Sequence, residues 1–290
     1  MGRVLRVIGW VLGALVVIVL IAAAGVYVSA QRKLGQHFDN PRLQLTVSST
    51  PERIERGRYL VTAFPGCAGC HSSNPAANPP VLDGSLVEDL KPIGDLYAPN
   101  LTPGGPLRDW GDGDIVRAIR EGVDRDGRGL LLMPSDDYKH LSDEDVQSVV
   151  AYLRGQPPVQ KELPTPRLTA LGTVLVGTGQ FPLSDQPPVR DVAAPARGPT
   201  AAYGRYLVET SGCAACHGPN LDAQNIPQGP PPGPSLRVVK GWTAEQFVKT
   251  LREGVDPSGH QLAETMPWRQ YGKGSDDDLR ALYEYLKSLP

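Results

Sequence analysis

Cys67-Ala68-Gly69-Cys70-His71 and Cys213-Ala214-Ala215-Cys216-His217 decide how this sequence is interpreted, because they contain all four of its cysteines. C-x-x-C-H is the pattern of covalent c-type haem attachment. Two thiols at this spacing bond the two vinyl groups on one porphyrin edge, and the histidine that follows reaches the iron. A single C-x-x-C would be ambiguous between a thiol-redox pair, half of a zinc site and a disulfide. Two copies, each followed at once by histidine, predict two covalently bound haem c groups.

The motifs belong to a longer unit that occurs twice. Three further stretches recur at matching positions: Gly57-Arg58-Tyr59-Leu60-Val61 as Gly204-Arg205-Tyr206-Leu207-Val208, Arg120-Glu121-Gly122-Val123-Asp124 as Arg252-Glu253-Gly254-Val255-Asp256, and Met133-Pro134 as Met266-Pro267. The repeat predicts two tandem haem domains, residues 51–154 and 200–290, joined by a proline-rich connector at 155–199.

Each copy predicts three helices, so the fold class is expected to be mainly α. The first helix begins at a threonine cap, the middle helix ends at a glycine, and the last begins with a capping box and continues with a one-face apolar stripe. The residues that carry these signals are Thr50 and Thr200, Gly122 and Gly254, and Ser142-x-x-Asp145 and Ser275-x-x-Asp278. Gly57 and Gly204 are expected to let the first and last helices of each unit cross closely.

The N-terminal segment Val7–Ala30 contains 24 mostly apolar residues and no charge. At about 1.5 Å per residue it is roughly 36 Å long as a helix, enough to cross a bilayer. A cleaved signal peptide is the alternative, with small-residue sites at Ala22–Ala24 and Val28–Ala30, although signal apolar regions usually run only about 7–15 residues. We therefore predict an uncleaved anchor at residues 1–33, followed by a linker at 34–50.

The charges that flank this segment do not decide its orientation, since Arg3 and Arg6 precede it while Arg32 and Lys33 follow it. In bacteria, haem is attached to such motifs outside the cytoplasmic membrane. The expected localisation is therefore the cell inner membrane, crossed once, with a cytoplasmic N-terminus and both haem domains in the periplasm.

His71 and His217 supply one axial iron ligand each, and methionine is the predicted second ligand. Apart from Met1, the only methionines are Met133 and Met266, which lie at matching positions before proline. Methionine is often a core filler, but two fillers at these matched positions would be a coincidence. Thioether ligation would raise the reduction potential, and two six-coordinate irons suit electron transfer.

The remaining histidines are expected to be structural. His260, in a loop before Met266, is the main alternative ligand, and His140 a weaker one, whereas His37 is expected at the surface. A second set of polar residues leaves two interpretations open, haem-propionate binding or packing: Trp110, Trp242, Arg120 and Arg252.

Composition limits the partners. The formal net charge of −2 gives no reason to expect nucleic acid, and 29 prolines with 32 glycines predict long irregular loops. Residues 51–154 hold 11 Lys and Arg against 17 Asp and Glu, a difference of −6. One hypothesis is that this domain docks on a basic partner; solvated acidic faces are the alternative.

Two loop regions carry further expectations. His71 and Trp110 are 39 positions apart, whereas His217 and Trp242 are 25 apart, so the first unit is expected to form an extra loop over one haem edge. The connector stretch Leu168–Phe181 is apolar but only 14 residues long. We expect it to pack against a domain rather than to enter the membrane.

With these motifs in place, the sequence resembles the class I (mitochondrial-type) cytochrome c fold over residues 51–154 and 200–290, in a membrane-anchored dihaem version. The phrase Ala98-Pro99-Asn100-Leu101-Thr102-Pro103 and the stretch Leu141–Val146 are similar to the cytochrome c subunits of membrane-bound alcohol and gluconate dehydrogenases, which typically carry three haems. The resemblance implies the axial pairs His71 with Met133 and His217 with Met266. It also implies thioether links at Cys67, Cys70, Cys213 and Cys216.

The expected function is that of a dihaem electron carrier rather than an enzyme. It would pass single electrons between a membrane or periplasmic donor and an acceptor, and its expected partners are redox proteins such as an oxidase, a dehydrogenase or a quinol-oxidising complex. A dihaem peroxidase is the enzymatic alternative, but it needs one iron with an open or displaceable ligand position. Whether the chain is a free shuttle or a subunit of a larger complex stays open at this point.

Overall fold

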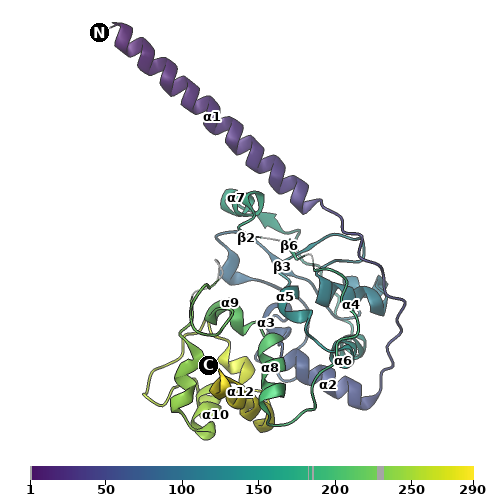
Figure 1. The fold of residues 1–290 in the computed structure, drawn as a ribbon. Coiled ribbons are helices and arrows are strands. Elements are labelled where there is room, and N and C mark those ends of the chain that lie inside the picture. Colours follow the sequence, from purple (N-terminus) through teal and green to yellow (C-terminus); the bar gives the residue numbers. More distant parts are fainter. Residues whose placement is uncertain (1, 182, 185, 227–231) are drawn as a thin grey trace.

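The computed structural model describes residues 2–181, 183–184, 186–226 and 232–290. Helix α1 (Gly2–Leu34) projects from a body made of two helical units (Figure 1). We call residues 51–154 the first unit and residues 200–290 the second unit. The predicted fold class, mainly helical with an N-terminal apolar helix, is confirmed.

Short helices and loops build both units. In the first unit the helices are α2 (Pro51–Thr62), α3 (Ala68–His71), α4 (Asp112–Glu121), α5 (Ser135–Tyr138) and α6 (Asp143–Arg154), with 3-10 turns η1 (Glu88–Leu90) and η2 (Pro106–Asp109). In the second they are α8 (Ala201–Glu209), α9 (Cys213–His217), η3 (Leu236–Gly241), α10 (Ala244–Glu253), α11 (Trp268–Tyr271) and α12 (Asp276–Ser288). The connector contributes α7 (Ala170–Thr178).

Strands only fasten loops to one another. They form three antiparallel pairs: β1 (Ser85–Leu86) with β3 (Tyr97–Ala98), β2 (Gly94–Asp95) with β5 (Arg167–Leu168), and β4 (Leu130–Leu131) with β6 (Leu183–Ser184). Two of the pairs join the first unit to the connector.

The predicted helix ends are present. The hydroxyls of Thr50 and Thr200 accept hydrogen bonds from the backbone N–H three residues on, as N-caps do. Helices α4 and α10 end at Gly122 and Gly254, whose φ values of 68° and 74° are left-handed. Glycine adopts that conformation without strain, which explains why both helices end there.

Gly57 and Gly204 allow the close crossing that was expected of them. A Cβ atom at Gly57 would lie 1.9 Å from the Ser148 carbonyl oxygen of α6, and one at Gly204 would lie 1.9 Å from the Ala281 oxygen of α12. The obstructing atoms are backbone, so they cannot rotate away. The first and last helices of each unit are therefore in backbone contact.

Substituting either glycine by alanine is expected to destabilise its unit by about 1–3 kcal/mol or more, the usual cost of overpacking a core. Chemical denaturation followed by circular dichroism would measure the loss. Gly241→Ala is the matched control, because a Cβ there meets nothing within 4 Å. Equal midpoints for all three variants would contradict the crossing.

Each unit contributes one tyrosine that forms hydrogen bonds with the other unit across their interface. Tyr206 of α8 donates its hydroxyl hydrogen to Asp145 and accepts the backbone N–H of Ser142, at the start of α6. Tyr59 of α2 makes the same two bonds to Asp278 and Ser275, at the start of α12. Each unit thus completes the N-terminus of the other unit's last helix.

This exchange corrects the predicted capping boxes. Ser142 Oγ does accept the N–H of Asp145, at 3.1 Å. The reciprocal bond is replaced, because the Asp145 carboxylate faces Tyr206 and Arg56 and the tyrosine oxygen takes the Ser142 N–H instead. In each box, one hydrogen bond is local and the other comes from a tyrosine of the neighbouring unit.

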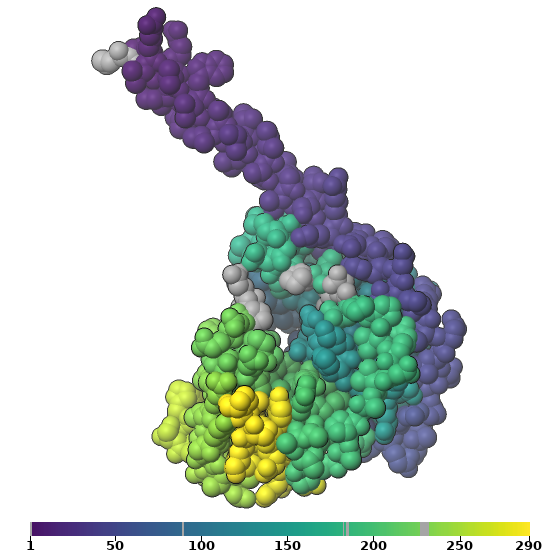
Figure 2. Space-filling view, viewed as in Figure 1, coloured from purple at the N-terminus to yellow at the C-terminus, as the bar shows by residue number. Residues whose placement is uncertain are grey.

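Helix α7 packs against a domain as expected, and it makes one further contact. It packs on the first unit, where a Cβ at Gly172 would lie 2.0 Å from the Ile93 carbonyl oxygen. It also packs on α1, where a Cβ at Gly177 would lie 2.4 Å from the Val26 oxygen. The predicted domain contact is therefore present, but the same short helix also holds the apolar N-terminal helix, as Figure 2 shows at the base of α1.

The acidity of the first unit is partly neutralised by cations from outside residues 51–154. Arg42 lies 3.8 Å from Asp114, and Lys161 lies 2.8 Å from Asp83. The connector also supplies Arg190 to Glu121 and Arg197 to Glu144. The difference of −6 therefore overstates the negative charge that a partner would meet, while docking on a basic partner stays a prediction.

Candidate haem sites

The two C-x-x-C-H motifs form two short helices, α3 and α9, at matching places in the units. Burial raises the pKa of Cys67 and of Cys213 to about 12. Both thiols are therefore protonated at neutral pH, whereas a thiol-redox C-x-x-C pair works through a low-pKa thiolate. This environment disfavours the redox interpretation of the motif.

Each motif histidine is held by a proline carbonyl. His71 Nδ1 lies 2.9 Å from the oxygen of Pro99, and His217 Nδ1 lies 2.6 Å from that of Pro234. A carbonyl oxygen only accepts, so Nδ1 carries the hydrogen and donates it. Nε2 is then the nitrogen with a lone pair, oriented as a metal-ligating histidine is by its outer hydrogen bond.

The protonation state of both rings agrees with this role. Burial lowers the pKa of His71 and of His217, despite the opposing effect of the carbonyl bonds. Imidazole binds iron in its neutral form, which lowered pKa values favour.

The proline carbonyls are the functional groups that sequence reasoning missed. Pro99 lies 28 positions after His71 within the quoted Ala98–Pro103 phrase, and Pro234 lies 17 after His217 at the end of a proline run. Their unequal spacing hid the equivalence. The extra loop of the first unit supplies Pro99, so it reaches the back of the His71 ring.

Met133 and Met266 are both half-buried against the core of their own unit. Met133 packs on the same cluster as Cys67, Trp110 and Tyr138. Met266 packs on the cluster that includes Cys213, the counterpart of Cys67. In each unit, the predicted methionine ligand and the first cysteine of the motif therefore pack against the same hydrophobic core.

Buried polar atoms near the methionines fit a bound group with acceptors. Ser135 Oγ and Trp268 Nε1 stand two residues after Met133 and Met266, and neither has a hydrogen-bond partner among the described residues. Gly233 fits as well, since a Cβ there would lie 2.6 Å from the His217 ring. Unsatisfied buried donors are costly in a finished protein, so these residues suit a haem in each unit.

The two repeat arginines have structural partners. Arg120 bonds the Leu141 carbonyl oxygen and Asp143, while Arg252 bonds the Gly272 carbonyl oxygen and Asp276. Both therefore tie the middle helix to the region where the last helix begins, which favours the packing interpretation. Trp110 and Trp242 pack against their cores, and a propionate contact of their indoles stays a prediction.

The other histidines lie at the surface. His37, His140 and His260 are all exposed. His260 sits in a turn where its backbone N–H donates to Asp256, away from the packed position of Met266. Met266 thus remains the better placed of the two as a ligand.

The two motifs approach one another through the unit interface. Gln270 of α11 donates to the carbonyl oxygens of Ala63 and Pro65, just before Cys67, at 3.3 and 3.2 Å. The Phe64 ring stacks on Tyr271 with centroids 5.4 Å apart. In the opposite direction, a Cβ at Gly212 would lie 3.3 Å from Asp137, beside the second motif. Each methionine segment thus borders the other unit's attachment motif.

Several curated relatives of this chain are cytochrome subunits. The chain is 30% identical over 278 residues to the gluconate 2-dehydrogenase cytochrome c subunit of Pantoea cypripedii, covering 81% of this chain and 59% of that one. It is 31% identical over 269 residues to the alcohol dehydrogenase (quinone) cytochrome c subunit of Gluconacetobacter polyoxogenes, covering 82% and 56%. The chain therefore spans just over half the length of these subunits. It is 26% identical over 305 residues to a diheme cytochrome c-type protein of Cereibacter sphaeroides, covering 95% of this chain and 96% of that one.

A family model covers both units. The model described as cytochrome C oxidase, cbb3-type, subunit III matches residues 52–153 and again 199–286. These relatives confirm the predicted resemblance to dehydrogenase cytochrome c subunits. With the two histidine motifs and their proline carbonyls, the match shows that the chain belongs to this cytochrome c family.

Proposed function

We propose that the chain holds two covalent haem c groups and carries single electrons as the cytochrome component of a membrane-bound dehydrogenase. The observation that carries the proposal is the identical support of His71 and His217 by the carbonyls of Pro99 and Pro234. A haem c group supplies one iron that takes up and releases one electron. The chain's own residues do the rest.

Cys67, Cys70, Cys213 and Cys216 would form the thioether links, and His71 with Met133 and His217 with Met266 would hold the irons. The Nδ1 bonds fix the imidazole planes and increase the basicity of Nε2. The methionines favour the reduced metal and so a higher potential. With a histidine and a methionine to hold each iron, the units would suit electron transfer rather than peroxide chemistry.

The interface supports transfer between the two units. Gln270 and Tyr271 bring the second unit against the segment that leads into Cys67, and Asp137 lies beside the segment that leads into Cys213. The apolar stacking of Phe64 on Tyr271 helps to exclude water from this junction. An electron entering at one unit would therefore leave from the other.

Helix α1 supports membrane attachment. It is long and apolar enough to cross a bilayer by length and composition. It also runs unbroken through both candidate cleavage sites, and Ala30 is fully buried beside α7. We propose a single span with the N-terminus cytoplasmic and both units periplasmic.

A redox titration of the purified chain tests the carrier function. Two low-spin centres with the weak far-red band of methionine-ligated ferric haem are expected, together with two haems per chain by the pyridine haemochrome assay. One high-spin centre that reacts with peroxide would contradict the proposal and favour a dihaem peroxidase. Blue-native electrophoresis with haem staining tests the partner: co-migration with a dehydrogenase supports the subunit role, and migration alone contradicts it.

A further inference from the structure

Helix α7 has an apolar surface that nothing in the described chain covers. Its sequence, ALGTVLVGT, contains no charged residue. Val176 is fully buried, but Leu171 and Val174 on the other side are 51% and 46% exposed. A helix that is apolar all round normally lies in a protein core or in a membrane. The described residues of this chain do not cover the exposed side of α7.

The place of α7 along α1 indicates what covers it. Ser29 Oγ donates to the Gly177 carbonyl oxygen at 2.8 Å, so α7 meets α1 near Val26 and Ser29. Arg32 ends the apolar stretch three residues after Ser29 and six after Val26. At about 1.5 Å per residue, α7 meets α1 roughly 4.5–9 Å from Arg32 on the bilayer side, and the Lys33 side chain reaches back to donate to the Gly177 carbonyl oxygen at 3.3 Å. An interfacial helix is buried about 5–10 Å at the boundary of headgroups and acyl chains.

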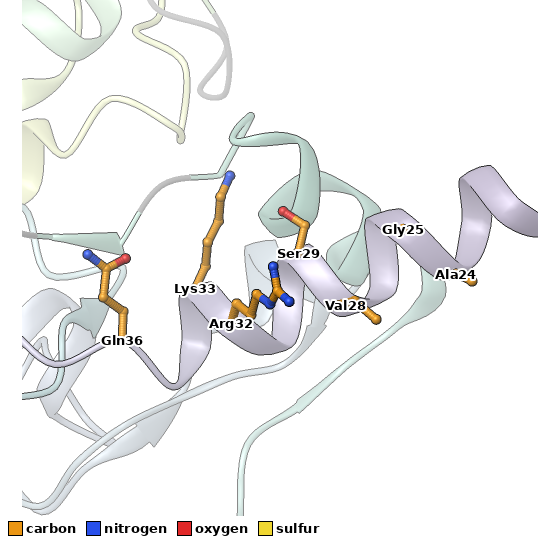
Figure 3. Close-up of a pocket in the computed structure, with 7 residues that line it drawn as sticks. All are labelled: Ala24, Gly25, Val28, Ser29, Arg32, Lys33 and Gln36. Carbon is orange, nitrogen blue, oxygen red and sulfur yellow. The ribbon is translucent and has the colours of Figure 1, made fainter.

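A groove along α1 has the chemistry of a phospholipid site. It is an open groove of about 510 Å³, lined at one end by Ala24, Gly25 and Val28 and at the other by Arg32 and Lys33. Figure 3 shows Ser29 and Lys33 directed toward α7, where both side chains donate to the Gly177 carbonyl oxygen, at 2.8 and 3.3 Å. Arg32, at the C-terminal end of α1, matches a lipid phosphate, and Ala24 and Gly25, nearer the bilayer centre, leave room for an acyl chain.

Helix α7 is joined firmly to the first unit. Strand β5, just before it, pairs with β2 so that Leu168 is opposite Gly94. The backbone N–H of Thr169 donates to the Ile93 carbonyl oxygen at 2.9 Å, and Gly172 packs on the same oxygen. Whatever holds α7 therefore also holds the first unit.

We propose that α7 lies in the outer interfacial layer of the membrane that α1 spans, with Leu171 and Val174 among lipid acyl chains and with Arg32 at a lipid phosphate. The occupant of this surface is the phospholipid bilayer, because the surface continues that of the anchor helix and has the Arg32 cation on the headgroup side. This contact sets the orientation of the first unit toward the membrane. The inference rests on the proposed anchoring by α1.

Spin labels on the full haem-loaded chain in phosphatidylcholine–phosphatidylglycerol vesicles test the placement. A label at Val174→Cys is expected to collide with dissolved oxygen, which concentrates in lipid, several-fold more than with a water-soluble nickel chelate. Val238→Cys is the matched control: Val238 is 52% exposed on η3 of the second unit, and the preference there is expected to be reversed. Unsubstituted protein gives the background from the native cysteines.

The outcomes separate α7 from the anchor. Protein that resists carbonate washing, with a Val174 label as open to nickel as the Val238 label, would overturn the α7 placement and leave the anchor intact. Protein that washes off would overturn both. A Val174 label shielded from both reagents would show a protein covering instead, again against the proposal.

Orientation supplies a second readout. The double variant Leu171→Asp, Val174→Asp should remain in the membrane pellet through α1 but lose most of the linear dichroism of the haem bands in oriented bilayers. Val238→Asp should keep it. Undiminished dichroism in the double variant would show that α7 does not orient the first unit.

Discussion

Substituting Met266 by leucine is expected to give a chain with normal covalent haem content in which one of the two centres binds carbon monoxide. Leucine has nearly the same volume as methionine, and such swaps usually cost less than about 1.5 kcal/mol, so the core around Met266 should persist. The thioether ligand would be lost. About half of the far-red band should disappear, and the potential of that centre should fall within the range of about 0.8 V that axial ligands span.

Four further variants make this result decisive. Met133→Leu should do the same to the other centre, and the double variant should lose the far-red band entirely. Met266→His should restore a closed low-spin site at lower potential. His260→Gln is the control for the competing ligand, and it should leave the spectrum unchanged because His260 is exposed. A changed spectrum in His260→Gln with none in Met266→Leu would reverse the assignment.

Asp145→Asn is expected to destabilise the chain by about 3–5 kcal/mol, the usual cost of stranding one member of a buried ion pair. Both oxygens of Asp145 accept bonds of 2.8 Å from Arg56, and the two side chains are 2% and 10% exposed. The variant would leave the Arg56 guanidinium buried without its counter-charge and would weaken the bond from Tyr206. Urea unfolding followed by circular dichroism measures the loss.

The neighbouring residues supply the controls. Glu144→Gln, one residue away, changes a carboxylate that is 71% exposed and should shift stability by no more than about 0.5 kcal/mol. Asp278→Asn, the equivalent change in the second unit, should cost less than Asp145→Asn. The position that corresponds to Arg56 there is Tyr203, which brings no charge. Equal losses at Asp145 and Asp278 would argue against the ion pair as the cause.

The same pair has a pH signature. Burial by itself would raise the pKa of Asp145, but the bonds from Arg56 outweigh it and hold that pKa below the ordinary value. A carboxylate with a lowered folded-state pKa stabilises the fold above its unfolded pKa and loses that contribution as the pH falls through the folded pKa. The gap between wild type and Asp145→Asn should therefore narrow on acidification.

Much of this architecture could be predicted from the sequence, because the signals were local. A threonine before Pro51, a glycine after Glu121 and a C-x-x-C-H motif each act within a few residues. The internal repeat then doubled the information, since a feature present twice at matching positions is seldom accidental. For this reason the helix ends at Gly122 and Gly254 lie where they were expected.

What could not be predicted depended on contacts between distant residues. Tyr59 and Tyr206 repeat like core residues, and only the folded chain brings their hydroxyls to Ser275 and Ser142 of the opposite unit. Pro99 and Pro234 act through backbone oxygens, which no side-chain pattern reveals. The dual packing of α7 needed the position of Val26 as well as that of Ile93.

The reciprocal tyrosines have a consequence for how the molecule conducts. If a flexible linker joined the two units, the rate of electron transfer between them would depend on how often they came into contact. Here a tyrosine of each unit bonds the first residues of the other unit's last helix, so the fold would fix the distance between the two proposed haem sites. Electron transfer from a donor bound at one unit to an acceptor bound at the other would then need no movement of one unit relative to the other.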